Sequence, residues 1–160
     1  MTGRILVTGS ARGIGRAIAL RLARAGHDMI LHGRSPSTPL AEAAAAVAGT
    51  GVRAWQLAFD IGDREAANAA LTADIEQNGA YYGVVCNAGI ARDNAFPALS
   101  GEDWDQVIRT NLDGFYNVLS PVVMPMIRRR QPGRIVTISS VSGVLGNRGQ
   151  VNYSAAKAGI

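Results

Sequence analysis

The chain has 160 residues, of which 48% are hydrophobic and 18% charged, a balance that is ordinary for a soluble globular protein. Its net charge of +4 comes from scattered arginines, without the aromatic interleaving or zinc-ligand spacing of a nucleic-acid-binding module. One cysteine, Cys86, excludes an internal disulfide, and no apolar segment resembles a signal peptide or could span a membrane. We therefore expect a single domain over residues 1–160, cytoplasmic, with no nucleic-acid or membrane partner.

The first elements in chain order are a strand, a glycine-rich turn, a helix and a second strand. The β-branched run from Arg4 to Thr8 predicts a buried strand, and 28–32 predicts the next one. Between them, apolar residues recur every four positions as far as Gly26, which is typical of a helix and its end. Such a β-α-β unit requires parallel strands joined by a right-handed crossover.

The rest of the chain continues to alternate between strands and helices. Strands are expected at 52–59, 83–86 and 134–138, helices at 40–48, 64–77, from 100 or 101 to about 130 and from 152, and loops at 35–39, 90–100 and 141–151. Asp63 should cap the helix at 64–77, and Pro121 and Pro125 should bend or break the long helix. This order predicts an α/β fold with a Rossmann-type, doubly wound parallel sheet.

A glycine-rich segment, Gly9-x-x-x-Gly13-x-Gly15, follows the first strand and precedes the first helix. Gly9 permits a tight turn, Gly13 lets the backbone approach a pyrophosphate, and Gly15 lets the helix pack closely on the strand. The first amide groups of the helix and its dipole can then bind phosphates. Glycines also serve ordinary turns, but their position after the first strand favours a dinucleotide site.

Two arginines bear on which dinucleotide is bound. The end of the second strand has no acidic residue to read a free ribose hydroxyl, and it carries Arg34 instead. Arg12 lies within the glycine-rich loop. Because guanidinium groups pair with phosphate in a bidentate way, the two arginines favour the 2′-phosphate of NADPH. The alternative is that both are solvated surface arginines in an arginine-rich chain.

Three side chains near the end of the sequence form a candidate acid–base group. Tyr153 and Lys157 are four positions apart, so that on a helix they share one face. A neighbouring ammonium favours the phenolate and so prepares the phenol for proton exchange. Ser140 follows a predicted strand and could hydrogen-bond a carbonyl oxygen that Tyr153 protonates. Lys157 is the only lysine among 16 basic residues, although taken alone the pair could be a chance surface arrangement.

Together these segments resemble the short-chain dehydrogenase/reductase family. The matching residues are in the order and spacing of the family and run along the whole chain: Thr8, Gly9, Gly13, Ile14, Gly15, Asp60, Asn87, Ala88, Gly89, Asn111, Ser140, Tyr153 and Lys157. Within the family, segments 90–94 and 147–159 look like the bacterial 3-oxoacyl-[acyl-carrier-protein] reductases. The resemblance implies NADPH-dependent reduction of a 3-oxoacyl thioester in fatty acid synthesis. Alternatives are a reductase of another small ketone or alcohol, or a non-catalytic NADP-binding fragment.

The resemblance also implies a role for each site residue. Tyr153 would protonate the substrate carbonyl as hydride arrives, Lys157 would assist it and hold the nicotinamide ribose, and Ser140 would bind the carbonyl oxygen. Asn111 would bend its helix locally and hold a water molecule; a surface amide is the alternative. Asp60 would contact the adenine; a helix-capping carboxylate is the alternative. The cofactor-binding set is Gly9, Ser10, Arg12, Gly13, Ile14, Gly15, Arg34, Asp60, Ile61, Asn87, Ala88, Gly89, Tyr153 and Lys157, and no metal is expected.

Partners are implied in the same way. Relatives are usually homotetramers built through the long helices that carry Asn111 and Tyr153. Arg128, Arg129 and Arg130 would either dock an acidic acyl carrier protein or form a solvated helix end. The family has further strands, a substrate-covering loop and helices beyond the position of Ile160. We therefore expect a fold truncated at the C-terminus, with an open edge at the fifth strand.

Overall fold

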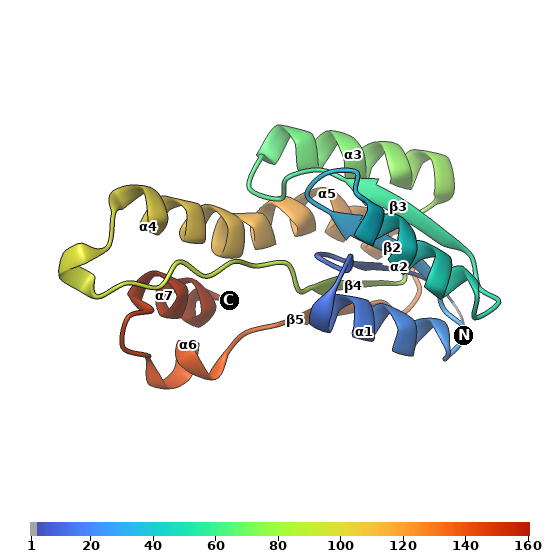
Figure 1. Cartoon of the computed structure of the whole chain (residues 1–160). Coiled ribbons are helices and arrows are strands. Elements are labelled where there is room, and N and C mark those ends of the chain that lie inside the picture. Colours follow the sequence, from blue (N-terminus) through green and yellow to red (C-terminus); the bar gives the residue numbers. More distant parts are fainter. Residues whose placement is uncertain (1–2) are drawn as a thin grey trace.

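The computed structural model describes residues 3–160 as a five-stranded parallel sheet with helices on both faces (Figure 1). The strands are β1 (Arg4–Val7), β2 (Asp28–Gly33), β3 (Ala54–Ala58), β4 (Gly83–Cys86) and β5 (Arg134–Thr137). Their order across the sheet is β3-β2-β1-β4-β5, so the chain moves first to one side of β1 and then to the other. The predicted Rossmann-type, doubly wound sheet is confirmed.

Two apolar cores lie on opposite faces of the sheet because successive side chains of a strand point to opposite sides. Val7 and Leu31 pack on one face with the helices α1 (Gly13–Ala23) and α2 (Thr38–Ala48). Leu6 and Ile30 pack on the other face with α3 (Arg64–Asn78) and α5 (Gly114–Arg128). Burying each of these strand side chains contributes about 1.5–3 kcal/mol to the stability of the fold. The central strands therefore hold the loops at their ends in fixed positions.

The helix starts follow from local capping. Asp63 caps α3 as predicted, with its carboxylate accepting a hydrogen bond from the amide of Ala66 at 3.0 Å. The predicted loop at 35–39 is too long, because Ser37 caps α2 and Pro39 fits within the first helical turn. The strand predicted at 52–59 was also drawn too long, because the observed strand β3 begins at Ala54 and ends at Ala58.

The long helix is interrupted around Asn111, where a local bend was predicted, and not at its two prolines. Its first part, α4 (Gly101–Ile108), leads into a π-helical turn, η2 (Arg109–Asp113), which is followed by α5. Pro121 and Pro125 were predicted to bend or break the helix; both lie inside α5, so they do not break it. Packing of α5 against α3 holds the helix despite the backbone hydrogen bonds that the two prolines cannot donate.

The segment after β5 lies at one end of the molecule in Figure 1, where a short helix α6 (Val141–Leu145) is followed by α7 (Val151–Gly159). The prediction of an uninterrupted loop at 141–151 is therefore wrong in its first half. Ser140 caps α6, and a glycine with a positive φ angle ends it, so local capping overrides the loop-like composition. The loop at 90–100 contains a 3₁₀ turn, η1 (Phe96–Ala98).

The strand β5 lies at the edge of the sheet, as expected. Its apolar residues Ile135 and Val136 are 44% and 47% exposed. Across residues 3–160, no helix combines the length and apolar character needed to cross a membrane.

Candidate active site

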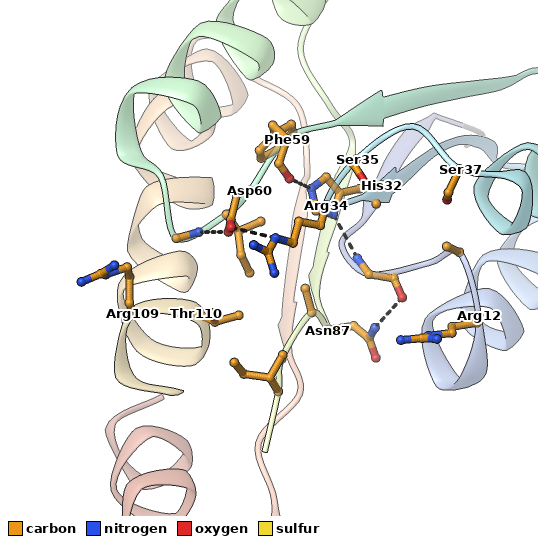
Figure 2. Close-up of a pocket in the computed structure, with 18 of the residues that line it drawn as sticks. Arg12, His32, Arg34, Ser35, Ser37, Phe59, Asp60, Asn87, Arg109 and Thr110 are labelled. Carbon is orange, nitrogen blue, oxygen red and sulfur yellow. Dashed lines mark hydrogen bonds and ion pairs between the residues drawn. The ribbon is translucent and has the colours of Figure 1, made fainter. Parts of the chain in front are cut away.

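A cleft of about 820 Å³ opens at the carboxyl ends of the parallel strands (Figure 2). Most of its wall is formed by residues at or just after the ends of β1, β2, β3 and β4, which is where open α/β sheets bind ligands, and the rest includes residues of the helix around Arg109. Residues of the predicted cofactor set that line it are Gly9, Arg12, Arg34, Asp60, Ile61, Asn87, Ala88 and Gly89. The fold thus gathers residues that are far apart in the sequence onto one surface.

The turn between β1 and α1 has the backbone that a phosphate site requires. Gly9 and Gly13 have φ angles of +65° and +57°, a conformation that favours glycine. A Cβ atom at Gly15 would collide with the carbonyl oxygen of Gly9, so glycine is needed for α1 to approach so closely. Arg12, the N-cap of α1, makes no side-chain capping bond to any described residue. The first amides of α1 are therefore suited to an anionic ligand.

Within the glycine-rich turn and the start of α1, the predicted cofactor residues Ser10, Gly13, Ile14 and Gly15 do not line this cleft. Ser10 is buried, and its hydroxyl accepts a hydrogen bond from the amide of His32 at 2.9 Å. Ile14, in the first turn of α1, is exposed. The contribution of these four residues to cofactor binding stays a prediction. The buried hydroxyl of Ser10 can contribute only indirectly, by holding the loop in position.

Arg34 forms an ion pair with Asp60 at the rim of the cleft, as Figure 2 shows. The Nε atom of Arg34 lies 3.1 Å from Oδ2 of Asp60, while Oδ1 of Asp60 accepts a hydrogen bond from the amide of Gly62 at 2.9 Å. Because the arginine side chain is 85% exposed, the pair is weak and a ligand phosphate can compete for the guanidinium. The capping alternative for Asp60 does not hold, since Asp63 caps α3.

His32, at the end of β2, was not predicted to have a role, yet its imidazole lies at the centre of the cleft wall. Its Nδ1 accepts a hydrogen bond from the amide of Gly9 at 3.1 Å, and its Nε2 lies 2.9 Å from the carbonyl oxygen of Phe59. Burial lowers the pKa of His32 to about 4, although the bond to Phe59 and the charge of Asp60 oppose this shift. The only signal in the sequence is a polar residue ending an apolar strand.

Asn87 joins the ends of β4 and β1. Its Nδ2 donates to the carbonyl oxygens of Thr8 at 2.9 Å and Gly9 at 3.3 Å. In return, Oγ1 of Thr8 accepts hydrogen bonds from the amides of Asn87 at 2.9 Å and Ala88 at 3.0 Å. These bonds hold the ends of β4 and β1 together, with Asn87 and Thr8 supporting each other.

Tyr153 and Lys157 share one face of α7, with Nζ of Lys157 5.7 Å from the centroid of the Tyr153 ring. Lys157 is only 4% exposed, and its ammonium donates a hydrogen bond to the carbonyl oxygen of Ile138 at 2.6 Å. Burial lowers the pKa of Lys157, and the neighbouring Cys86 opposes this shift. The hydroxyl of Ser139 donates to the carbonyl oxygen of Lys157 at 2.7 Å and so fixes α7 against the end of β5.

Ser140 caps α6, because its hydroxyl oxygen accepts a hydrogen bond from the amide of Ser142 at 3.2 Å. The hydroxyl proton of Ser140 is thus left to donate to another acceptor. Ser140, Tyr153 and Lys157 do not line this cleft, whose lining does include Ile90 and Arg92.

Gly89 connects this cleft with the candidate acid–base group. A Cβ atom on Gly89 would lie 3.0 Å from Oδ1 of Asn111 and 3.7 Å from Nζ of Lys157. Asn111 lies in the π-helical turn η2, as its predicted role in distorting the helix requires, and it is 2% exposed. The alternative of a surface amide is therefore wrong. Asn111, Lys157 and the cleft wall meet at Gly89.

Cys86 ends β4 beside the lysine of this group. Burial raises the pKa of the Cys86 thiol to about 12, although the charge of Lys157 opposes the shift. The adjoining Asn87 makes its hydrogen bonds to the end of β1. Among the described residues, no group of histidine, cysteine and acidic side chains has the arrangement of a metal site.

The three arginines at the C-terminal end of α5 lie near the amino-terminal ends of the strands, opposite the cleft. The guanidinium of Arg129 donates to the carbonyl oxygens of Tyr81 at 3.0 Å and Pro132 at 2.7 Å, which precede β4 and β5. Arg129 thus has a structural role, whereas Arg128 and Arg130 are exposed. Carrier-protein docking at these positions stays a prediction.

The sequence matches the family model described as short chain dehydrogenase over residues 4–160. The chain belongs to the short-chain dehydrogenase/reductase family. Among its relatives is the 3-oxoacyl-[acyl-carrier-protein] reductase FabG of Aggregatibacter actinomycetemcomitans, 64% identical over 160 residues, which are 100% of this chain and 66% of that protein. The FabG protein of Aquifex aeolicus (strain VF5) is 43% identical over 155 residues, 97% of this chain and 62% of that protein.

A solved structure from the family has the same fold. The crystal structure of a putative short-chain alcohol dehydrogenase from Sinorhizobium meliloti 1021 superposes with a TM-score of 0.92 at 34% identity, covering 99% of this chain and 63% of that one. This short-chain dehydrogenase/reductase chain therefore spans just under two thirds of the length of the relatives that it matches.

Proposed function

We propose that the protein reduces a 3-oxoacyl thioester, of the kind carried by acyl carrier protein in fatty acid synthesis, with NADPH as the hydride donor. The single observation that carries the proposal is the meeting of the cleft with Asn111 and Lys157 at Gly89. The printed name of the 64% identical relative supports the substrate class.

The described residues fit a nicotinamide dinucleotide in three ways. The start of α1 offers free amides to a pyrophosphate, Gly15 allows the close approach of helix and strand, and Arg12 and Arg34 can pair with a 2′-phosphate. When bound, such a cofactor supplies the hydride that adds to the substrate carbonyl carbon. Arg34 supports NADPH over NADH, since it lies on the cleft wall where an acidic residue would read a free ribose hydroxyl.

The chain's own residues would move the proton. The phenol of Tyr153 donates its proton to the carbonyl oxygen, which becomes the hydroxyl of the product. Lys157 stabilises the phenolate left behind, because its ammonium lies on the same face of α7. Ser140 uses its free hydroxyl proton to hold the carbonyl oxygen in place. Asn111 positions the loop at Ile90 beside this group through two hydrogen bonds of 2.8 Å.

A second candidate is reduction of another small ketone, and the similarity to a putative short-chain alcohol dehydrogenase favours it. Both reactions use the same acid–base group, so they differ in the substrate alone. For the thioester reaction, Arg128 and Arg130 are the candidate contacts for an acidic carrier protein, since Arg129 is held by backbone carbonyls. Assembly into a homotetramer is part of the same proposal.

The test is the oxidation of NADPH by the purified chain with an acetoacetyl thioester, run beside the Tyr153→Phe variant. We expect NADPH absorbance to fall with the wild type and not with the variant, because the phenol proton is needed. Turnover by Tyr153→Phe equal to wild type would contradict the proposed mechanism. A faster reaction with a simple ketone than with the thioester would favour the second candidate. Calorimetry with NADPH alone would test cofactor binding without turnover.

A further inference from the structure

The imidazole of His32 joins two segments of the cleft wall (Figure 2). On one side it meets the amide of Gly9 at 3.1 Å, and on the other the carbonyl oxygen of Phe59 at 2.9 Å. An amide can only donate and a carbonyl can only accept, so Nδ1 must be the acceptor and Nε2 must carry the proton. The ring is 2% exposed and packs at 4.4 Å, centroid to centroid, against Phe59. The two contacts therefore hold the imidazole neutral and in one tautomer.

Gly9 is constrained from its other sides as well. Its carbonyl oxygen accepts a hydrogen bond from Asn87, and a Cβ atom would lie 2.9 Å from Cα of Ala88. The side chain of His32 contacts Gly9 through the backbone amide, which donates a hydrogen bond to Nδ1. Because Gly9 has a φ angle of +65° and begins the glycine-rich turn, the direction of its amide sets how the turn leaves β1.

We propose that His32 is a positioning residue for the cofactor, which holds the amide of Gly9 and thereby the glycine-rich turn in the shape that binds the dinucleotide. The inference rests on the proposed function. The alternative is that His32 only stabilises the fold. In that case, loss of either of its two hydrogen bonds would weaken cofactor binding to the same extent.

Two variants separate the bonds. In His32→Asn the side-chain oxygen can take the place of Nδ1 and accept from Gly9, but the contact with Phe59 is lost. In His32→Gln the longer side chain can donate to Phe59, and the amide of Gly9 loses its acceptor. Asn and Gln are chemically alike, so each is the matched control of the other.

The readout is the Kd for NADPH by calorimetry, without substrate. We expect His32→Asn to bind within about threefold of wild type and His32→Gln about tenfold more weakly, because an unpaired buried donor is costly. Urea unfolding of both variants shows whether affinity merely follows stability. In the free wild-type protein, the ¹⁵N shifts of the imidazole should report the Nε2–H tautomer at neutral pH.

Equal loss of affinity in both variants, or none in His32→Gln, would overturn the inference, as would the Nδ1–H tautomer. These outcomes leave the proposed function intact as long as the wild type binds NADPH. If the wild type bound neither NADPH nor NADH, the proposed function would fail, and this inference with it.

Discussion

Asn111 and Ile90 exchange two hydrogen bonds of 2.8 Å, in which the side-chain amide of Asn111 matches both the amide and the carbonyl group of Ile90. The bonds tie the π-helical turn η2 to the segment after β4, across 21 positions of sequence. Asn111→Asp would replace the donor by a carboxylate oxygen facing a carbonyl oxygen. We expect a loss of about 1–3 kcal/mol in the free energy of unfolding, measured in urea.

The matched control for this variant is Asn68→Asp, on the exposed side of α3, which should stay within about 0.5 kcal/mol of wild type. Equal stabilities for the two variants would mean that the bonds to Ile90 do not hold η2 in place.

A buried ion pair lies at the amino-terminal end of β1, opposite the cleft, and should stabilise the fold without contacting the cleft. Arg4 donates to both carboxylate oxygens of Asp74, at 2.9 and 2.7 Å, and the hydroxyl of Tyr81 donates to the same carboxylate at 2.7 Å. Asp74→Ala would leave the buried guanidinium without its counter-charge. We expect the free energy of unfolding to fall by about 3–5 kcal/mol in urea titrations. Asp28→Ala, which breaks an exposed pair with Arg53, should have a much smaller effect.

The choice between the two nicotinamide dinucleotides should depend on Arg34. Arg34→Ala removes a guanidinium from the cleft rim, so the Kd for NADPH should rise about tenfold while that for NADH stays the same. Calorimetry with each dinucleotide gives the ratio directly. Arg24→Ala, at the C-terminal end of α1, serves as the control for the loss of one positive charge. An unchanged ratio in Arg34→Ala would place the selection of NADPH elsewhere.

Stability should fall in mild acid because His32 is buried as the neutral form. Its pKa is lowered to about 4 in the folded protein from 6.5 in the unfolded chain, so between these values the unfolded chain binds the extra proton. The contribution of His32 is therefore present above pH 6.5 and is lost as the pH falls towards 4. Between about pH 7.5 and about pH 5 we expect a loss of about 2 kcal/mol.

Urea unfolding at the two pH values checks this prediction, with His32→Asn as the comparison. The variant has no titrating group at this position and should lose less stability between them. A wild-type protein that loses no more than the variant would show that His32 titrates alike in the folded and unfolded states.

Local signals were enough to predict much of the fold. Apolar strands, glycine turns and the cap at Asp63 act over a few residues, so their effect can be read directly from the chain. The short helix α6 was missed because its cap, Ser140, lies in a glycine-rich segment that looks like a loop. Pro121 and Pro125 do not break α5, because packing on α3 outweighs the local preference of proline for a helix end.

The sequence by itself determined the parallel α/β fold, the glycine-rich turn and the pairing of Tyr153 with Lys157 on one helical face, because each depends on spacing along the chain. Only the tertiary structure decided that Gly89 would bring Asn111 and Lys157 to the cleft, and that His32 would hold Gly9. These contacts join residues from different strands and helices, and their distances are set by how the sheet and its helices pack rather than by any local pattern.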